Sequence, residues 1–138
     1  MVEIKFYECG YYCDLKAVLV DAGLFWDYSD DESSLCRKIS KDNESILVAF
    51  VDGVLVGTLF ICEDFQPMLF RIAVLNKFQN RGVGSMLIVE AERLLKLKGY
   101  SHVSIQVAAN DLGLQKFYEK KGFVNSGQYV WMTKKLIV

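Results

Sequence analysis

A turn with two glycines separates a short apolar segment from a long amphipathic one near the middle of the chain. The apolar segment covers residues 70–75, and the turn that follows it contains Gly82 and Gly84. A glycine-rich turn at the start of a helix leaves backbone N–H groups without acceptors at the positive end of the helix dipole. Such groups bind phosphate. The sequence therefore predicts a phosphate-binding turn at this place.

The spacing of the glycines distinguishes between the known kinds of phosphate-binding turn. A dinucleotide-binding turn requires G-x-G-x-x-G, but Leu87 occupies the third glycine position. A P-loop requires a lysine directly after its second glycine, and neither glycine has one. The pattern here is Q-x-x-G-x-G, from Gln79 to Gly84. The alternative is a turn whose glycines serve only close packing, but Asn80 and Arg81 place polar groups beside them that packing does not require.

The segments on either side of this turn predict a strand and a helix that would hold it in place. The run at 68–75 is short and apolar, which is typical of a buried strand. The helix would run to Lys98, and Gly99 would end it. Its apolar residues recur at helical spacing and are Val83, Met86, Leu87, Ala91, Leu94 and Leu95.

The remaining segments complete a chain of alternating strands and helices. In order they are a strand at 2–7, helices at 11–22 and 30–41, strands at 46–51 and 54–62, a strand at 101–107, a helix from Asn110 to Gly122, and a strand at 129–138. Asp52-Gly53 predicts a hairpin, and Ser29 with Glu32 predicts a capping box before the second helix. A strand–helix–strand crossover implies that 101–107 lies parallel to 68–75.

A second pattern lies in the helix that begins at Asn110. Tyr118-Glu-Lys-Lys-Gly-Phe123 matches the Y-E-K-x-G-F pattern of the GNAT superfamily of acyl-CoA-dependent N-acetyltransferases, and the Q-x-x-G-x-G turn resembles the pyrophosphate loop of that family. The resemblance covers nearly the whole chain from Val2 on. It implies an α+β (mixed α/β) GNAT-like fold in a single acetyltransferase domain, 1–138. The fold would have a mixed twisted sheet of six to seven strands, an antiparallel meander with 68–75 and 101–107 parallel and splayed, flanked by about four helices.

The resemblance also implies an activity, the transfer of an acetyl group from acetyl-CoA to a primary amine by direct attack. The thioester arm would insert between the splayed strands, where backbone groups of Ile72, Ala73 and Val74 would pair with it. The Val74 N–H would face the thioester oxygen, and one such donor is worth roughly 3–4 kcal/mol in other acyl-transfer sites. Tyr118 would give a proton to the leaving thiolate. The pyrophosphate would be bound by the turn residues Gln79, Asn80, Arg81, Gly82, Val83, Gly84 and Ser85.

Three positions depart from the family pattern, and one of them is Leu114, where the family usually has a small residue in this helix. The asparagine that usually contacts the pantetheine arm falls on Asp111, with Asn110 one residue earlier, so either residue is a candidate for that contact, and Asn110 is also a candidate helix cap. The glutamate that acts as base in some relatives falls on Gln106, which cannot take a proton. An amine with a pKa near 10.4 is only about 0.04% neutral at pH 7, so a base or a desolvating pocket is needed. The candidates are a relayed water, Glu63, Asp64 and Asp27.

The segment between the first two predicted helices mixes aromatic and acidic residues. One interpretation is that Phe25 and Trp26 fill the core while Asp30 and Asp31 favour a helix N-terminus. The other is that Trp26, Asp27 and Tyr28 line an acceptor pocket for a cationic amine. The acceptor would then be a small cationic amine or a protein amine.

Composition limits the other functions. The 16 basic and 17 acidic residues give a net charge of −1, which argues against nucleic acid and anionic membranes as partners. No apolar run reaches the roughly 20 residues of a membrane span. One histidine and four cysteines without a C-x-x-C pair predict no metal site, and reduced, mostly buried thiols in a cytoplasmic protein. A homodimer is left open. The alternative functions are a catalytically weak acyl-CoA-binding sensor or regulatory module and, third, a nucleotide-binding module.

Overall fold

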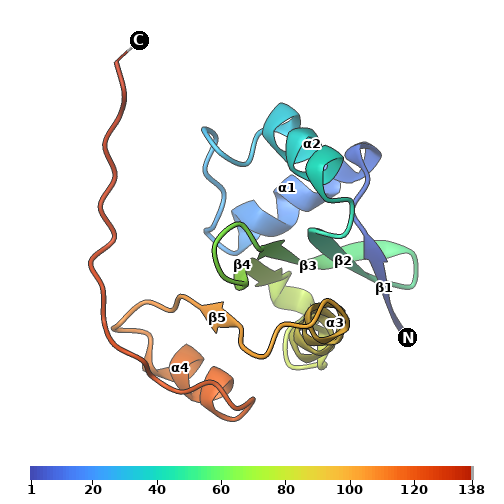
Figure 1. Ribbon diagram of the computed structural model, residues 1–138. Coiled ribbons are helices and arrows are strands. Elements are labelled where there is room, and N and C mark those ends of the chain that lie inside the picture. The colour runs from blue at the N-terminus through green and yellow to red at the C-terminus, as the bar shows by residue number, and fades with distance from the viewer. Residues whose placement is uncertain (138) are drawn as a thin grey trace. The chain divides into compact units, whose positions relative to one another are not determined.

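A computed structural model describes residues 1–137 of the chain. The chain divides into two compact units, Met1–Ile105 and Gln106–Val138. Figure 1 labels the helices and strands of both units.

The first unit contains a five-stranded mixed sheet. Its strands, in both spatial and chain order, are β1 (Val2–Phe6), β2 (Ile46–Val51), β3 (Val54–Cys62), β4 (Met68–Val74) and β5 (Ser104–Ile105). The first four strands pair antiparallel, and β5 pairs parallel to β4. This sheet confirms the predicted α+β class and the predicted meander followed by a parallel strand.

Helices cover both faces of this sheet (Figure 1). They are α1 (Tyr12–Asp21), α2 (Glu32–Lys41) and α3 (Val83–Leu97), with short 3-10 turns η1 (Cys9–Tyr11) and η2 (Asn76–Phe78). One core cluster joins Leu15 and Leu19 of α1 to Ile46 and Val48 of β2. On the other face α3 buries Leu87 and neighbouring apolar side chains. Because β3 is covered on both faces, its residues 55–61 are all buried, which explains its continuous apolar run.

Local turn signals were read correctly at two places. Asp52 and Gly53 both have positive φ, 50° and 81°, as a tight hairpin turn requires. Gly99, with φ of 92°, follows the end of α3. The predicted cap of α2 was wrong: Asp31, not Ser29, is the N-cap, and its carboxylate accepts from the Ser34 N–H at 3.2 Å. Ser29 lies in the preceding turn, where its own N–H donates to the Trp26 carbonyl at 3.1 Å.

A bulge interrupts β4 beside the point where β5 ends. Thr58 lies opposite Ala73 and Phe60 opposite Phe70, so two residues of β4 face one residue of β3. Arg71, within this bulge, has φ of 51°. In the described part of the chain, β5 pairs with β4 only at 68–69. The strand predicted at 101–107 is therefore only two residues long, and β4 continues beyond its pairing with β5.

The second unit contains the helix α4 (Leu112–Glu119) followed by a segment without regular secondary structure. The predicted last strand, 129–138, is wrong over 129–137, and Val138 lies outside the described residues. Alternating apolar residues show only that a segment suits a strand, and a strand forms only where a neighbouring strand completes the hydrogen bonds. The sheet therefore has five strands in the described chain rather than six or seven. None of the helices within residues 1–137 has the length and apolar character needed to cross a bilayer.

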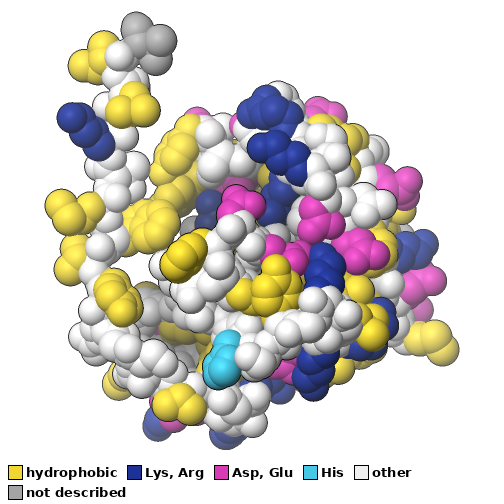
Figure 2. All heavy atoms as spheres, viewed as in Figure 1, with side chains coloured by type: hydrophobic (Ala, Val, Ile, Leu, Met, Phe, Trp, Pro, Cys, Tyr) yellow, Lys and Arg dark blue, Asp and Glu magenta, His cyan; other side chains and the backbone are white. Residues whose placement is uncertain are grey.

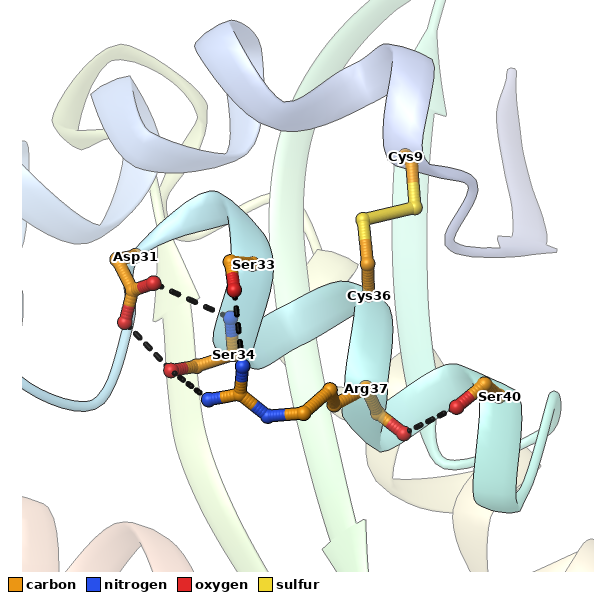
Figure 3. The surroundings of a disulfide bond; sticks show 7 residues. All are labelled: Cys9, Asp31, Ser33, Ser34, Cys36, Arg37 and Ser40. Atoms are coloured by element: carbon orange, nitrogen blue, oxygen red, sulfur yellow. Dashed lines mark hydrogen bonds between the residues drawn. A yellow bond between two sulfur atoms is a disulfide. The ribbon is translucent and has the colours of Figure 1, made fainter.

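The cysteines differ from the prediction of reduced, buried thiols. Cys9 of η1 and Cys36 of α2 form a disulfide across 27 residues of sequence (Figure 3). Cys13 and Cys62 are free, Cys13 exposed and Cys62 partly so. Nothing in the local spacing of the cysteines indicates this pairing, because it depends on how α2 packs beside η1.

Candidate active site

The C-terminal part of β4 presents backbone groups along an open edge. The Leu75 N–H donates to the Val56 carbonyl of β3 at 2.8 Å. Because successive N–H groups of a strand point to opposite sides, the Val74 N–H points away from β3. In the described chain, β5 pairs with no residue of β4 beyond Leu69. The Val74 N–H therefore lies on the edge of β4 that faces away from β3, beyond the two residues that pair with β5.

The neighbouring predicted residues differ in their pairing. Ala73 lies opposite Thr58 in the ladder with β3, whereas Ile72 lies in the bulge, where the register with β3 shifts. The Val74 carbonyl on this open edge accepts from the Gln79 side-chain amide at 3.2 Å. The Gln79 side chain thus connects the turn before α3 to the C-terminal end of β4.

The turn between η2 and α3 has the backbone conformation that its glycine-rich sequence predicts. Asn80 and Gly82 have positive φ, 62° and 81°, and Gly82 is the N-cap of α3. No side chain caps this helix end, and the Met86 N–H makes the first α-helical bond, to the Gly82 carbonyl at 3.0 Å. The N–H groups of the first turn, from Val83 to Ser85, have no acceptor within the helix itself. They are therefore oriented for an anion at the positive end of the α3 dipole.

Gly84 lies at the closest point between this turn and β4. A Cβ at Gly84 would lie 3.8 Å from a methyl carbon of Val74, which is ordinary contact. Packing within the protein therefore does not require glycine here.

The donors of the turn suit a diphosphate. Between Asn76 and Ser85 the chain has no carboxylate and two cationic side chains, Lys77 and Arg81. The Arg81 guanidinium lies over the Phe78 ring, 5.2 Å from its centre. Backbone N–H groups, a helix N-terminus and two cations together fit the pyrophosphate of a nucleotide cofactor such as coenzyme A.

The segment between α1 and α2 forms a network that the sequence indicated only in part. The rings of Trp26 and Tyr28 lie 5.5 Å apart. Asp30 is only 3% exposed, accepts from the Trp26 backbone N–H at 2.9 Å, and forms an ion pair with Arg71 at 3.1 Å. Asp30 therefore does not serve the helix N-terminus, as one interpretation held. Sequence reasoning missed Arg71 as the partner of Asp30. The signal that could have indicated it is that Arg71 is a single charged residue within an apolar strand.

The three carboxylates proposed as bases lie in different surroundings. Glu63 and Asp64 line a cavity of about 510 Å³, whereas Asp27 is not among its lining residues. The Glu63 carboxylate is held by the Lys98 ammonium at 2.6 Å. Burial in the same cavity lowers the pKa of Lys38, whose ammonium donates to the Ile61 carbonyl at 2.8 Å. Acidic and basic side chains are mixed on the face seen in Figure 2.

In the second unit, α4 carries the remaining predicted residues. The Asp111 carboxylate caps this helix by accepting from the Leu114 N–H at 3.0 Å, so Asn110, one residue earlier, is not the cap. Tyr118 is 5% exposed and meets Phe123 edge-on, with ring centres 5.7 Å apart. Burial, with a smaller contribution from the Asp111 charge, raises the pKa of Tyr118 to about 12. The phenol therefore keeps its proton at neutral pH.

No cluster of three or more histidine, cysteine, aspartate or glutamate side chains suited to a metal ion occurs within residues 1–137. The candidate groups of the first unit are thus the backbone N–H groups of β4 and of the turn before α3 and the aromatic loop between α1 and α2, and the second unit contains a buried phenol, Tyr118. The sequence model of the acetyltransferase (GNAT) family matches residues 14–123. The chain belongs to this family. Membership makes it an acyl-CoA-dependent N-acetyltransferase whose cofactor is acetyl-CoA.

Relatives of known sequence and structure agree with this assignment. An acetyltransferase of Yersinia enterocolitica is 25% identical over 138 residues, which cover 99% of this chain and 97% of the relative. The crystal structure of the PaiA N-acetyltransferase of Thermoplasma acidophilum in complex with coenzyme A superposes with a TM-score of 0.73, at 21% identity, over 87% of this chain and 88% of that one. An aminoglycoside 6′-N-acetyltransferase of Acinetobacter haemolyticus has a TM-score of 0.71, at 21% identity, over 98% and 99% of the two chains. The structural similarity establishes the shared fold.

Proposed function

We propose that this GNAT protein acetylates a primary amine, on a small cationic molecule or on a protein, by direct attack within one acetyltransferase domain, 1–138. When bound, acetyl-CoA supplies the thioester carbonyl that the amine attacks and the thiol that leaves. The observation that carries this proposal is the open edge of β4 at Val74, directly before the uncapped N-terminus of α3.

Two parts of the chain would hold the cofactor. The segment 72–74 would pair with the pantetheine amides, and the turn residues 79–85 would bind the pyrophosphate through backbone N–H groups. Asn110 would contact the pantetheine, because the carboxylate of Asp111 already serves as the cap of α4. The Val74 N–H would polarise the thioester carbonyl, with a contribution of roughly 3–4 kcal/mol by analogy with other acyl-transfer sites.

Tyr118 would protonate the leaving thiolate. With a phenol pKa of about 12 and a thiol pKa of about 8.5, this transfer is uphill by about 3.5 units, or roughly 5 kcal/mol. The step therefore depends on the phenolate regaining a proton from the product ammonium or from water. A phenol of high pKa has a compensating advantage, since it is fully protonated whenever a thiolate departs.

The acceptor would bind near the aromatic loop between α1 and α2. Tyr28 would offer a ring face to a cation and Asp27 a charge, next to the Trp26 ring, over which the Arg71 guanidinium already lies at 5.2 Å. Lys98 makes Glu63 the weakest of the proposed bases, which leaves Asp64, Asp27 and a relayed water.

An acetyl-CoA-dependent thiol-release assay tests the proposal. The acceptor panel would contain amino acids, polyamines, aminoglycosides and peptide N-termini, and the control reaction would omit the amine. We expect amine-dependent release with at least one class and the acetylated amine in the mass spectrum of the product. Release that does not depend on any amine contradicts the proposal.

A second candidate function is a catalytically weak acyl-CoA sensor. The observations that favour it are Gln106 at the position of a family base and the ion pair that occupies Glu63. Tight binding of coenzyme A together with no transfer to any member of the panel would support this function over catalysis.

A further inference from the structure

The bulge in β4 holds a residue in a conformation that its side chain disfavours. Arg71 has φ of 51°, in the left-handed region, where the Cβ of any residue other than glycine is crowded. The register with β3 shifts at this point, and pairing with β5 ends at Leu69, two residues earlier. A left-handed residue other than glycine persists only where its surroundings hold it.

The side chain of Arg71 has such surroundings. Its Nε lies 3.2 and 3.1 Å from the two carboxylate oxygens of Asp30, and its guanidinium lies over the Trp26 ring at 5.2 Å. The Arg71 side chain is 21% exposed and that of Asp30 is 3% exposed, so the pair is largely shielded from water. A buried carboxylate that lost its cation would be strongly destabilised. Each partner therefore depends on the other.

Asp30 is in turn fixed by its own loop. Its carboxylate also accepts from the Trp26 N–H at 2.9 Å, and its carbonyl accepts from the Tyr12 hydroxyl at 3.1 Å. Tyr12 belongs to α1, which packs against β3 and β4. The anchor of Arg71 is thus part of the folded core of the first unit rather than a surface contact.

We infer that Asp30 and Arg71 are positioning residues for catalysis: their ion pair holds the β4 bulge, and the bulge keeps the Val74 N–H on the open edge of the strand. Val74 lies three residues after Arg71, and a change of one residue in register would turn its N–H to the opposite side. The inference rests on the proposed role of Val74. It connects the aromatic loop between α1 and α2, which contains Asp30, to β4, whose Val74 N–H would polarise the thioester.

The test compares variants of the pair in the full chain. Asp30→Ala removes the anchor, and we expect a fall in kcat of roughly tenfold or more, because small displacements of a catalytic group have effects of this size. The Kd of coenzyme A, measured by calorimetry, should rise by a smaller factor than kcat falls, since the proposed pyrophosphate turn and α3 are untouched and only the proposed pantetheine contacts of 72–74 are disturbed. Asp30→Asn keeps an oxygen for the Arg71 Nε and should retain most of the activity.

A glycine at position 71 separates positioning from general stability. Glycine adopts positive φ freely, so Asp30→Ala combined with Arg71→Gly should keep the bulge without any anchor. We expect the double variant to recover kcat over Asp30→Ala. The control is Glu3→Ala, which removes a carboxylate from an exposed ion pair with Lys5 on β1 and should change neither kcat nor affinity.

The backbone amide resonances of Ile72–Val74, recorded without ligand, provide a readout independent of turnover. In Asp30→Ala they should shift, and in Glu3→Ala they should not. Unchanged kcat and unchanged resonances in a folded Asp30→Ala variant would overturn the inference. Wild-type protein that acetylates nothing in the panel would refute the proposed function instead, and the resonances would still decide whether the ion pair holds the bulge.

Discussion

The phenol of Tyr118 is the one side chain to which the proposed reaction assigns a proton transfer. In Tyr118→Phe the ring and its edge contact with Phe123 remain, and only the hydroxyl is lost. We predict that kcat falls at least about tenfold, which is the lower range for loss of a general acid. The Kd of coenzyme A should not change, because no phosphate contact is assigned to this residue.

The pH dependence gives an independent check on Tyr118. The phenol acts in its protonated form, and its pKa is raised to about 12. Wild-type kcat should therefore show no loss from this group as the pH rises to about 10, where an ordinary tyrosine would be half ionised. Tyr129→Phe, which changes an exposed tyrosine outside the proposed site, serves as the control. Equal turnover in Tyr118→Phe and wild type would remove the acid role.

A second tyrosine provides a test of stability. Tyr7 is 3% exposed, and its hydroxyl has no hydrogen-bond partner in the described chain. We predict that Tyr7→Phe raises the free energy of unfolding, by about 1 kcal/mol, because the unpaired hydroxyl no longer has to be desolvated. Urea denaturation at pH 7 measures the change. A loss of stability would mean that the hydroxyl has a partner.

The same residue makes stability depend on pH. Burial is the main reason that the pKa of Tyr7 is raised to about 12 in the folded state, against about 10 when unfolded. The folded state then holds the phenol proton more tightly than the unfolded state does. The contribution of this group to the free energy of unfolding is therefore fully present below pH 10 and is lost as the pH rises from 10 towards 12. Tyr7→Phe should unfold with a weaker dependence on pH across that window.

Among the elements, the contact between α3 and the sheet depends on one glycine. A Cβ at Gly57 of β3 would lie 3.2 Å from the Ala73 carbonyl oxygen, 3.2 Å from a Val83 methyl and 3.3 Å from a Leu87 methyl. The first of these is backbone and cannot rotate away. We predict that Gly57→Ala destabilises the protein by roughly 1–3 kcal/mol, the usual cost of overpacking.

The Gly57 variant should also weaken the binding of coenzyme A. The added methyl group pushes α3 from the sheet, and the proposed pyrophosphate turn is the N-terminus of that helix. Gly10→Ala is a matched control, because a Cβ there meets no atom within 4 Å and the backbone has no positive φ. Chemical denaturation and calorimetry measure the two effects. A Gly57→Ala variant that is as stable as Gly10→Ala would show that the helix can shift without loss.

For the whole molecule, sequence reasoning succeeded where the information is local. The hairpin at Asp52-Gly53, the helix ended by Gly99 and the uncapped glycine turn before α3 each depend on a few consecutive residues. The order of these elements, together with the crossover rule, was enough to predict the meander and the parallel strand. The family was predicted from two short patterns, and the match over 14–123 confirms it.

The features that sequence reasoning missed are contacts between residues far apart along the chain. The Asp30–Arg71 pair spans 41 residues and the disulfide of Cys9 spans 27, and no local pattern encodes either. The last strand was predicted from alternation alone, which carries no information on whether a neighbouring strand is present. The catalytic and cofactor-binding roles of individual residues stay predictions, because they concern a bound molecule.

The proposal of one domain leads to a test on the whole chain. The family match crosses the boundary at Ile105 between the two compact units, so we expect both to unfold in one transition. Coenzyme A at 100 times its Kd should then add about 2.7 kcal/mol to the free energy of unfolding and raise Tm by roughly 5–10 °C. Circular dichroism would follow the global transition, and hydrogen exchange would follow peptides from 83–97 and 112–119 separately. Protection of the first peptide alone would contradict a single domain, whereas equal protection of both would mean that ligand binding stabilises the chain as one cooperative structure.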